Sequence, residues 1–242
     1  MSISGKLDLF ICTDRDFNLP SVDESYKIIK LNQPNLTISN TGWMYVYDDT
    51  KLQNITPKHY GYSELSAIYW VWKNLETKKY VGFNHYNKYF DIQNFDAIEK
   101  IFEQYNIIVP VAVNLDKTVQ DQYDFYHNID DLLLIEEILK KEYPDYTEDY
   151  DKFIKNSNLL LPSNMFIMKR EDYEKYCEFL FNILFKFDEK RKIETEEDIF
   201  NIYKNISETT ENENLKFFEY QSKVHSFLGE RLFTLYILHI PH

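Results

Sequence analysis

Short apolar runs alternate along this sequence with longer amphipathic stretches, and this alternation restricts the fold more than any other feature. Several of the apolar runs are continuous and rich in β-branched and aromatic residues, which is typical of strands covered on both faces. Strands separated by helical stretches predict an α/β domain. The expected strands are Leu7–Cys12, Tyr26–Leu31, Met44–Tyr47, Tyr80–Phe83, Ile107–Val109 and Met165–Met168.

The amphipathic stretches predict helices. In the first of them Leu65, Ile68 and Trp72 fall on one face at helical spacing. Ser63 is the expected N-cap residue of this helix, because its hydroxyl can accept a hydrogen bond from a free N–H of the first turn. The expected helices are Ser63–Asn74, Asp131–Tyr143, Glu171–Phe187 and Lys223–Leu238.

A length of 242 residues suits one domain with a well-buried core, so residues 1–242 are expected to form a single domain. The segment Glu194–Asn214 departs from the pattern, because it is acidic and rich in Asn and Thr with few core-forming residues. This composition predicts a mobile acidic surface loop. A solvated insertion is the simpler interpretation of such a loop, and a lid that closes over a bound ligand is the alternative.

The formal net charge of −13 restricts the partners of the chain. Nucleic-acid binders usually carry a basic patch or stripe, and none is visible in the sequence, so no nucleic-acid partner is expected. An acidic protein gains little from anionic lipid headgroups, so any membrane contact is expected to be local and peripheral.

Cys12 and Cys177 lie far apart within apolar runs and predict buried free thiols rather than a disulfide framework or a zinc site. Free thiols fit a reducing compartment. The N-terminus has no apolar signal region, and no segment approaches the run of about 18 apolar residues that a membrane span needs. A cytoplasmic protein is therefore expected.

Polar side chains follow three of the expected strands. Thr13–Asp16 follows the first strand, Asp48–Thr50 the third, and Asn84–Lys88 the fourth. In open α/β sheets ligands bind beyond the carboxyl ends of the strands, so these three segments predict a ligand site. Asp and Asn are also common wherever a strand stops, and this simpler explanation applies to each segment taken alone.

An Asp-x-Asp pair is the usual handle by which a divalent cation holds a diphosphate. Two such pairs occur, at Asp14 with Asp16 and at Asp149 with Asp151, but so acidic a sequence produces such matches by chance. The second pair falls in an expected helix, and the first comes too early in the chain. No metal site is predicted, and the glycine-rich phosphate loops and the serine and zinc hydrolase motifs are missing.

Several blocks of sequence resemble the DUF4422 family, which is found among capsular, exopolysaccharide and O-antigen biosynthesis proteins. They occur in the family's order over nearly the whole chain. The resemblance implies a glycosyltransferase of the GT-A-like (Rossmann-like) fold, with a mixed, mostly parallel sheet flanked by helices. The matching blocks are Asp48–Thr50 with Asn54-Ile55, Tyr60–Asn74, Tyr80–Phe90, Thr118–Asp131, Asn164–Tyr173 and Ser226–Leu232.

The resemblance also places the donor diphosphate. In GT-A enzymes the metal-binding Asp-x-Asp follows a strand like Tyr80–Phe83, and here that place is held by residues 84–86, which include His85. We expect His85 and Lys88 to stabilise the leaving nucleoside diphosphate without a metal cofactor. The family usually has Arg where this chain has Asn87, Lys88 and Lys223. The bidentate phosphate contacts of arginine are thus replaced by the contacts that asparagine and lysine can make.

Further roles follow from the resemblance alone. Thr13, Asp48 and Asp49 are expected to hold the uridine, and Asn164 the donor or acceptor sugar. Arg231 is expected to contact the nucleotide sugar. Inverting transfer needs a carboxylate that deprotonates the acceptor hydroxyl. Glu230 is the favoured base, and Asp130 is the other candidate.

The expected function is transfer of a hexose, with galactose in pyranose or furanose form as the leading choice, from a UDP-sugar donor. The expected acceptor is a lipid-linked oligosaccharide of a surface polysaccharide, at the inner face of the plasma membrane. A non-catalytic nucleotide- or glycan-binding subunit of a polysaccharide assembly complex is one alternative. A glycoside hydrolase that uses paired carboxylates is another.

Overall fold

The computed structural model describes residues 5–17, 26–31, 43–46, 52–90, 92 and 95–240, with the backbone alone at 43–46, 95 and 96. The strands are β1 Leu7–Thr13, β2 Tyr26–Lys30, β3 Trp43–Val46, β4 Tyr80–His85, β5 Ile107–Ile108, β6 Val113–Asn114, β7 Leu159–Leu160 and β8 Phe166–Lys169. The α-helices are α1 His59–Tyr62, α2 Leu65–Asn74, α3 Phe95–Gln104, α4 Val119–Tyr126, α5 Ile129–Glu142, α6 Thr147–Tyr150, α7 Arg170–Arg191, α8 Glu196–Thr209, α9 Phe218–Gln221 and α10 Val224–His239. Short helical turns of other kinds occupy Thr56–Lys58, Pro144–Tyr146, Asp151–Lys155 and Glu213–Lys216.

Six strands form the main sheet in the order β3-β2-β1-β4-β8-β5. The first four run parallel, so that their carboxyl ends share one edge, while β8 is antiparallel to both of its neighbours. The predicted α/β class with a mixed, mostly parallel sheet is confirmed, and each expected strand is found within one or two residues. A small second sheet of β6 and β7 was not expected from the sequence.

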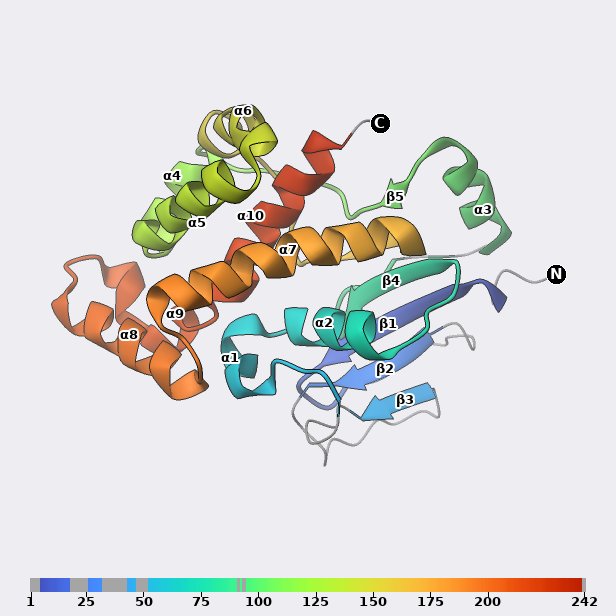
Figure 1. Cartoon of the computed structure of the whole chain (residues 1–242), viewed down its shortest axis with the longest axis horizontal. Coiled ribbons are helices and arrows are strands. Elements are labelled where there is room, and N and C mark those ends of the chain that lie inside the picture. The colour runs from blue at the N-terminus through green and yellow to red at the C-terminus, as the bar shows by residue number, and fades with distance from the viewer. Residues whose placement is uncertain are drawn as a thin grey trace.

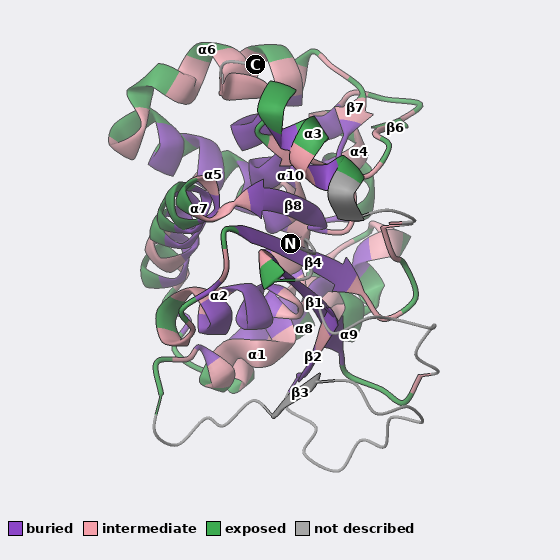
Figure 2. Cartoon of the chain, turned by 90° about the vertical axis from the view of Figure 1, so that its right-hand side faces the viewer, coloured by how far each residue is buried: buried purple, intermediate pink, exposed green. Residues whose placement is uncertain are grey.

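The central strand β1 is buried over its whole length, because helices cover both faces of the sheet. Its side chains alternate between two cores, as the two-residue period of a strand requires. Phe10 and Cys12 join the larger core, while Leu9 and Ile11 join a smaller core that includes Ile98 of α3. Figure 2 shows these central strands as a buried layer between the helices.

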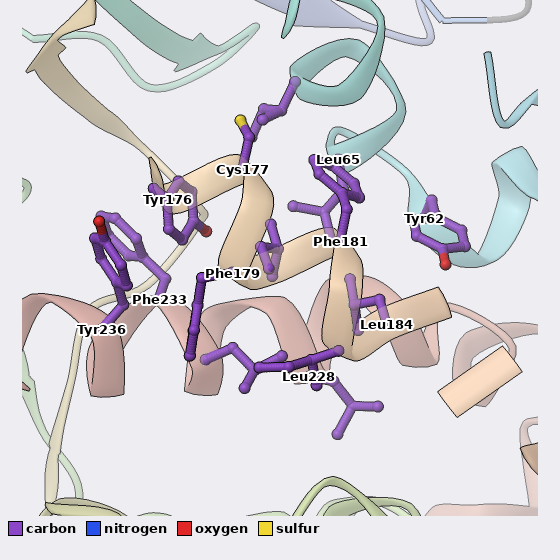
Figure 3. Packing of buried hydrophobic residues seen from close by; sticks show 14 of the residues in the cluster. Tyr62, Leu65, Tyr176, Cys177, Phe179, Phe181, Leu184, Leu228, Phe233 and Tyr236 are labelled. Carbon is purple, nitrogen blue, oxygen red and sulfur yellow. The ribbon is translucent and has the colours of Figure 1, made fainter. Parts of the chain in front are cut away.

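The long helix α7 organises the larger core. In Figure 1 it lies between the sheet with α2 on one side and α5 with α10 on the other, and it contacts all three of these helices. Aromatic rings fill the interface between α7 and α10, as Figure 3 shows. The ring centroids of Tyr176 and Phe233 are 5.4 Å apart, and those of Phe179 and Tyr236 are 5.2 Å apart. Packing of this kind accounts for much of the heavy aromatic content.

The expectation of a mobile loop at 194–214 is wrong, because most of this segment is helix α8. Thr195 and Asp198 form a capping box, in which each side chain accepts a hydrogen bond from the other residue's backbone N–H. Ile199 and Tyr203, four residues apart on one face, are buried, and the Tyr203 hydroxyl donates to Asp131 over 2.8 Å. Two apolar anchors therefore dock a helix whose other faces are acidic and solvated.

The start of the first expected helix also differs. Ser63 has a φ of 46° and separates α1 from α2, and its hydroxyl donates to the carbonyl of Tyr60 instead of capping α2. The other three expected helices are found as α5, α7 and α10.

Both cysteines are buried free thiols, as expected from their apolar surroundings. Burial raises the pKa of Cys12 and of Cys177, so neither is a reactive thiolate at neutral pH. Across the described part of the chain, every helix is too short or too polar to span a bilayer.

Candidate active site

A cavity of about 580 Å³ opens beyond the carboxyl ends of β1 and β4, the place where ligands of open α/β sheets bind. Segments far apart in the sequence form its walls. Its lining residues include Asp14, Arg15, His59, Glu64, His85, Lys88, Gln122, His127, Ser163, Tyr220, Lys223, Ser226, Glu230 and Arg231.

Positive charge gathers in this cavity although the chain is acidic. Arg15, Lys88, Lys223 and Arg231 line it and outnumber its three acidic groups, Asp14, Glu64 and Glu230, in a chain whose formal net charge is −13. A concave wall of low dielectric strengthens the field of such charges, so the cavity is suited to an anionic ligand.

A tight turn after β4 presents His85 and Lys88 to the cavity. The His85 N–H donates to the Lys88 carbonyl over 3.1 Å, and the Lys88 N–H donates back to the His85 carbonyl over 3.2 Å. Within the described part of the chain, Nδ1 of His85 is buried without a hydrogen-bond partner. A buried polar atom without a partner at a cavity wall indicates a place where a ligand completes the hydrogen bonding.

The turn before β8 connects this segment to α10. Ser163 and Asn164 both have positive φ angles, of 74° and 48°, which non-glycine residues adopt at an energetic cost. In this conformation the Ser163 N–H donates to Oε1 of Glu230 over 2.6 Å, and the Ser163 hydroxyl accepts from Nζ of Lys88 over 2.8 Å. Ser163 thus connects the Lys88 ammonium group to the Glu230 carboxylate.

Asn164 is 1% exposed and does not line the cavity, so the structure gives it a different role beside the sugar contact that stays a prediction. Its side-chain amide donates to Oε1 of Glu64 over 2.7 Å, and the Ser226 hydroxyl donates to the same oxygen over 2.8 Å. Gly229 allows this packing, because a Cβ there would lie 2.8 Å from Cδ1 of Leu65 and 3.3 Å from Oδ1 of Asn164. Asn164 therefore positions Glu64, which does line the cavity.

Glu230 has an altered protonation equilibrium. Its side chain is 21% exposed, and Oε2 accepts a hydrogen bond from Nη1 of Arg231 over 3.0 Å. Burial raises the pKa of Glu230 above its ordinary value, and the charge of Glu64 adds to the rise while Arg231 opposes it. A raised carboxyl pKa makes Glu230 a stronger base than an exposed glutamate.

Arg231 is fixed by several partners. Its Nη2 donates to Oε1 of Gln122 over 2.6 Å, and its Nη1 donates to the carbonyl of Phe227 over 3.0 Å. Its guanidinium lies over the ring of Tyr123, 5.1 Å from the ring centroid. A guanidinium held this rigidly loses little entropy when it binds or orients a neighbouring charge.

Two histidines of the cavity are neutral at pH 7. Burial lowers the pKa of His59 to about 4, and burial together with nearby Arg231 lowers the pKa of His127 to about 4. Neither therefore adds charge to the site, although each can donate or accept a hydrogen bond.

Of the remaining predicted residues, Thr13 and Asp130 do not line the cavity. The Thr13 hydroxyl is occupied with the backbone of Arg15, donating to its carbonyl over 2.6 Å, so Thr13 shapes the turn from behind the wall. Asp130 is exposed on the first turn of α5, away from the cavity-lining residues, and is not retained as a base. Asp48 and Asp49 lie outside the described residues.

Four cavity residues were not predicted from the sequence: His59, Glu64, Gln122 and His127. Glu64 belongs to the block Tyr60–Asn74, and Gln122 and His127 belong to the block Thr118–Asp131, so the resemblance included these three without singling them out, whereas His59 lies outside every block.

The described residues do not fit the divalent cation that many GT-A folds hold. Among them no three His, Cys, Asp or Glu side chains gather as metal ligands would. The acidic groups of the cavity have other partners, as when Asp14 accepts a two-pronged contact from Arg15 at 2.8 and 3.1 Å. Hard cations need several free oxygen ligands, and the described carboxylates of the cavity do not gather to supply them.

Comparison with known proteins supports this fold. The apo structure of the bifunctional glycosyltransferase WbbM superposes with a TM-score of 0.71 at 24% sequence identity, over 97% of this chain and 42% of that one. The likeness at this identity concerns the fold, and the chain spans about two-fifths of the length of WbbM. A search of curated proteins found no match. The profile described as a domain of unknown function, DUF4422, matches residues 8–199, and the chain belongs to this family.

Proposed function

We propose that this chain is a glycosyltransferase that moves a hexose from a UDP-sugar to a growing, lipid-linked surface polysaccharide. The observation that carries the proposal is the hydrogen-bonded series Lys88–Ser163–Glu230–Arg231 in one cavity. It combines a cation for a departing phosphate with a carboxylate of raised pKa for an attacking hydroxyl. The membership in DUF4422 and the shared fold with WbbM support the same reaction class.

The donor occupies the cation-lined part of the cavity. Lys88 and Lys223 balance the diphosphate charge, and His85 donates an N–H hydrogen bond to it. Negative charge grows on the diphosphate as the bond between the sugar and the phosphate oxygen breaks, so preorganised donors stabilise the transition state more than the ground state. In this proposal the cationic side chains replace a metal ion.

Glu230 acts as general base. The acceptor hydroxyl loses its proton to the Glu230 carboxylate while its oxygen forms a bond to C1 of the donor sugar. The C1–phosphate bond breaks with its electron pair going to UDP, and attack from the opposite face inverts the anomeric centre. The hydrogen bonds from Ser163 and Arg231 fix the carboxylate, and each oxygen retains a lone pair for the incoming proton.

The finer features come from the family resemblance. Galactose, in pyranose or furanose form, is the first donor sugar to test. The lipid-linked acceptor and the place at the inner face of the plasma membrane follow from the family's association with surface polysaccharides.

A specific observation also favours a second candidate function. Glu64 and Glu230 line the same cavity and are coupled electrostatically, and glycoside hydrolases use paired carboxylates. A hydrolase, however, has no need of a cation-lined phosphate site.

Thermal stabilisation by nucleotides separates the two candidates. UDP at 100 times its Kd is expected to stabilise the protein by about 2.7 kcal/mol. That free energy raises the Tm by roughly 5–10 °C for a chain of this length. GDP at the same concentration, the matched control, is expected to give a smaller shift. A hydrolase would be stabilised by neither nucleotide. If neither UDP nor GDP raised the Tm, the transferase proposal would be contradicted.

A further inference from the structure

A second cavity, of about 700 Å³, adjoins the one described above. The two share three lining residues, Gln122, His127 and Tyr220, which form the boundary between them. The second cavity lies beside α4 and the β6 segment, and nothing in the reaction described above occupies it.

Aromatic rings form one wall of this second cavity. Phe125 and Tyr126 are each 47% exposed, although large aromatic side chains are usually buried. Their rings meet edge to face with centroids 4.8 Å apart. Tyr220, 53% exposed, extends the aromatic surface to the boundary with the first cavity.

The backbone beneath these rings is fixed by hydrogen bonds. The carbonyl of Phe125 accepts from the side-chain amides of Asn212 and Asn214, over 3.3 and 2.9 Å, and the carbonyl of Tyr126 accepts from Gln221 over 2.8 Å. The backbone that carries the two rings is therefore fixed, and Nζ of Lys117 lies over the Phe125 ring, 4.4 Å from its centroid. A surface that is ordered before binding loses little entropy when a ligand settles on it.

The charges of the two cavities differ. Basic side chains outnumber acidic ones in the first cavity, where Arg15, Lys88, Lys223 and Arg231 face Asp14, Glu64 and Glu230. In the second cavity Lys117 and Asp116 balance, so it lacks the excess of positive charge that another phosphate would need. Aromatic faces with amide and carboxylate groups at their edge suit an uncharged saccharide, whose C–H faces pack on rings and whose hydroxyls hydrogen-bond.

We propose that this second cavity, the aromatic acceptor site, binds the acceptor glycan. The inference rests on the proposed function and adds where the acceptor lies. A sugar ring of the acceptor packs on Phe125 and Tyr126, and Asn114 and Asp116 bond its hydroxyls. The terminal sugar crosses the boundary at Gln122, which accepts from Arg231, which in turn donates to Glu230. The reacting hydroxyl thereby reaches Glu230 from the side of the cavity that Gln122 lines.

Saturation-transfer NMR with methyl glycosides tests the aromatic acceptor site. The probes are the methyl glycosides of galactose, glucose, N-acetylglucosamine, mannose and rhamnose, each added to the protein with and without UDP. At least one is expected to bind the wild-type chain, and Phe125→Ala and Tyr126→Ala are each expected to weaken that binding by about fivefold to tenfold, the loss of one aromatic contact.

Phe217→Ala is the matched control, because Phe217 is 71% exposed nearby and lines neither cavity. It is expected to leave glycoside binding unchanged. Failure of all five probes to bind the wild-type chain would overturn the inference, as would equal weakening by the control.

UDP stabilisation, measured on the same proteins, separates this inference from the proposed function. Phe125→Ala and Tyr126→Ala are expected to keep the wild-type response to UDP, because neither ring lines the first cavity. Intact UDP binding without glycoside binding overturns the acceptor site alone. Glycoside binding that depends on Phe125 without any UDP binding overturns the transferase proposal instead.

Discussion

Glu230→Gln is expected to lower the turnover of sugar transfer by about 10²–10⁴-fold, the usual contribution of a general base. The amide keeps the shape of the side chain, and its oxygen can still accept from the Ser163 N–H, but it cannot take the proton of the acceptor hydroxyl. UDP stabilisation should remain close to that of the wild-type chain. Steady-state kinetics with a UDP-sugar and an acceptor measures the loss.

The Glu230→Gln protein is expected to fold. Because burial raises the pKa of Glu230, the folded state binds the proton more tightly than the unfolded chain. The free energy of unfolding therefore falls as the pH rises from the unfolded pKa through the folded one. At neutral pH the charged group is thus a cost that the neutral amide removes, and Arg231 keeps Gln122 and Phe227 as acceptors.

Glu219→Gln is the matched control, since Glu219 is an exposed glutamate on α9 that does not line the cavity. It should leave turnover unchanged. Full turnover in Glu230→Gln would exclude Glu230 as the base, and Glu64, the other carboxylate of the cavity, would take its place as the first residue to test.

Lys88→Ala is expected to lower turnover by about 10²–10³-fold, the loss typical when one preorganised donor to a developing anion is removed. It is also expected to weaken UDP binding, because the charge acts on the bound diphosphate as well as on the leaving group. Lys88→Arg should restore most of both properties, since it restores the charge. Turnover and UDP affinity are measured on the same preparations.

Two controls isolate the charge of Lys88. Ser163→Ala removes the hydroxyl that accepts from Lys88 but keeps the N–H that donates to Glu230, so it should have a small effect. Lys175→Ala removes an exposed lysine of α7 that does not line the cavity, and should have none. Wild-type turnover in Lys88→Ala would contradict the role given to this lysine.

The sheet could be predicted because its signal is local. Each strand is an apolar run of its own, and Leu7–Cys12 reads as a buried strand whatever its neighbours are. Helix α8 could not be predicted in the same way, because only Ile199 and Tyr203 anchor it, and Tyr203 gains its buried partner Asp131 from a helix more than sixty residues earlier. A segment with so few apolar residues resembles a loop until its docking surface is known.

In the candidate site, too, the residues with a local sequence signal could be predicted and those that depend on long-range contacts could not. His85, Lys88, Glu230 and Arg231 stood in blocks that resemble the family, and all four line the cavity. The contact between Glu64 and Asn164 could not be predicted, because the two residues lie a hundred positions apart. That contact requires the positive φ of Asn164, which the sequence does not reveal for a non-glycine residue.

Release of UDP from a panel of UDP-hexoses, measured in the presence of EDTA, tests the central claim most directly. The account predicts that one UDP-sugar is slowly hydrolysed without any acceptor, that an acceptor glycan accelerates the release, and that Mn²⁺ adds nothing to the rate. Release that is abolished by EDTA and restored by Mn²⁺ would contradict transfer by cationic side chains alone. Absence of release from every UDP-sugar, with acceptor and metal both supplied, would contradict a UDP-sugar transferase altogether.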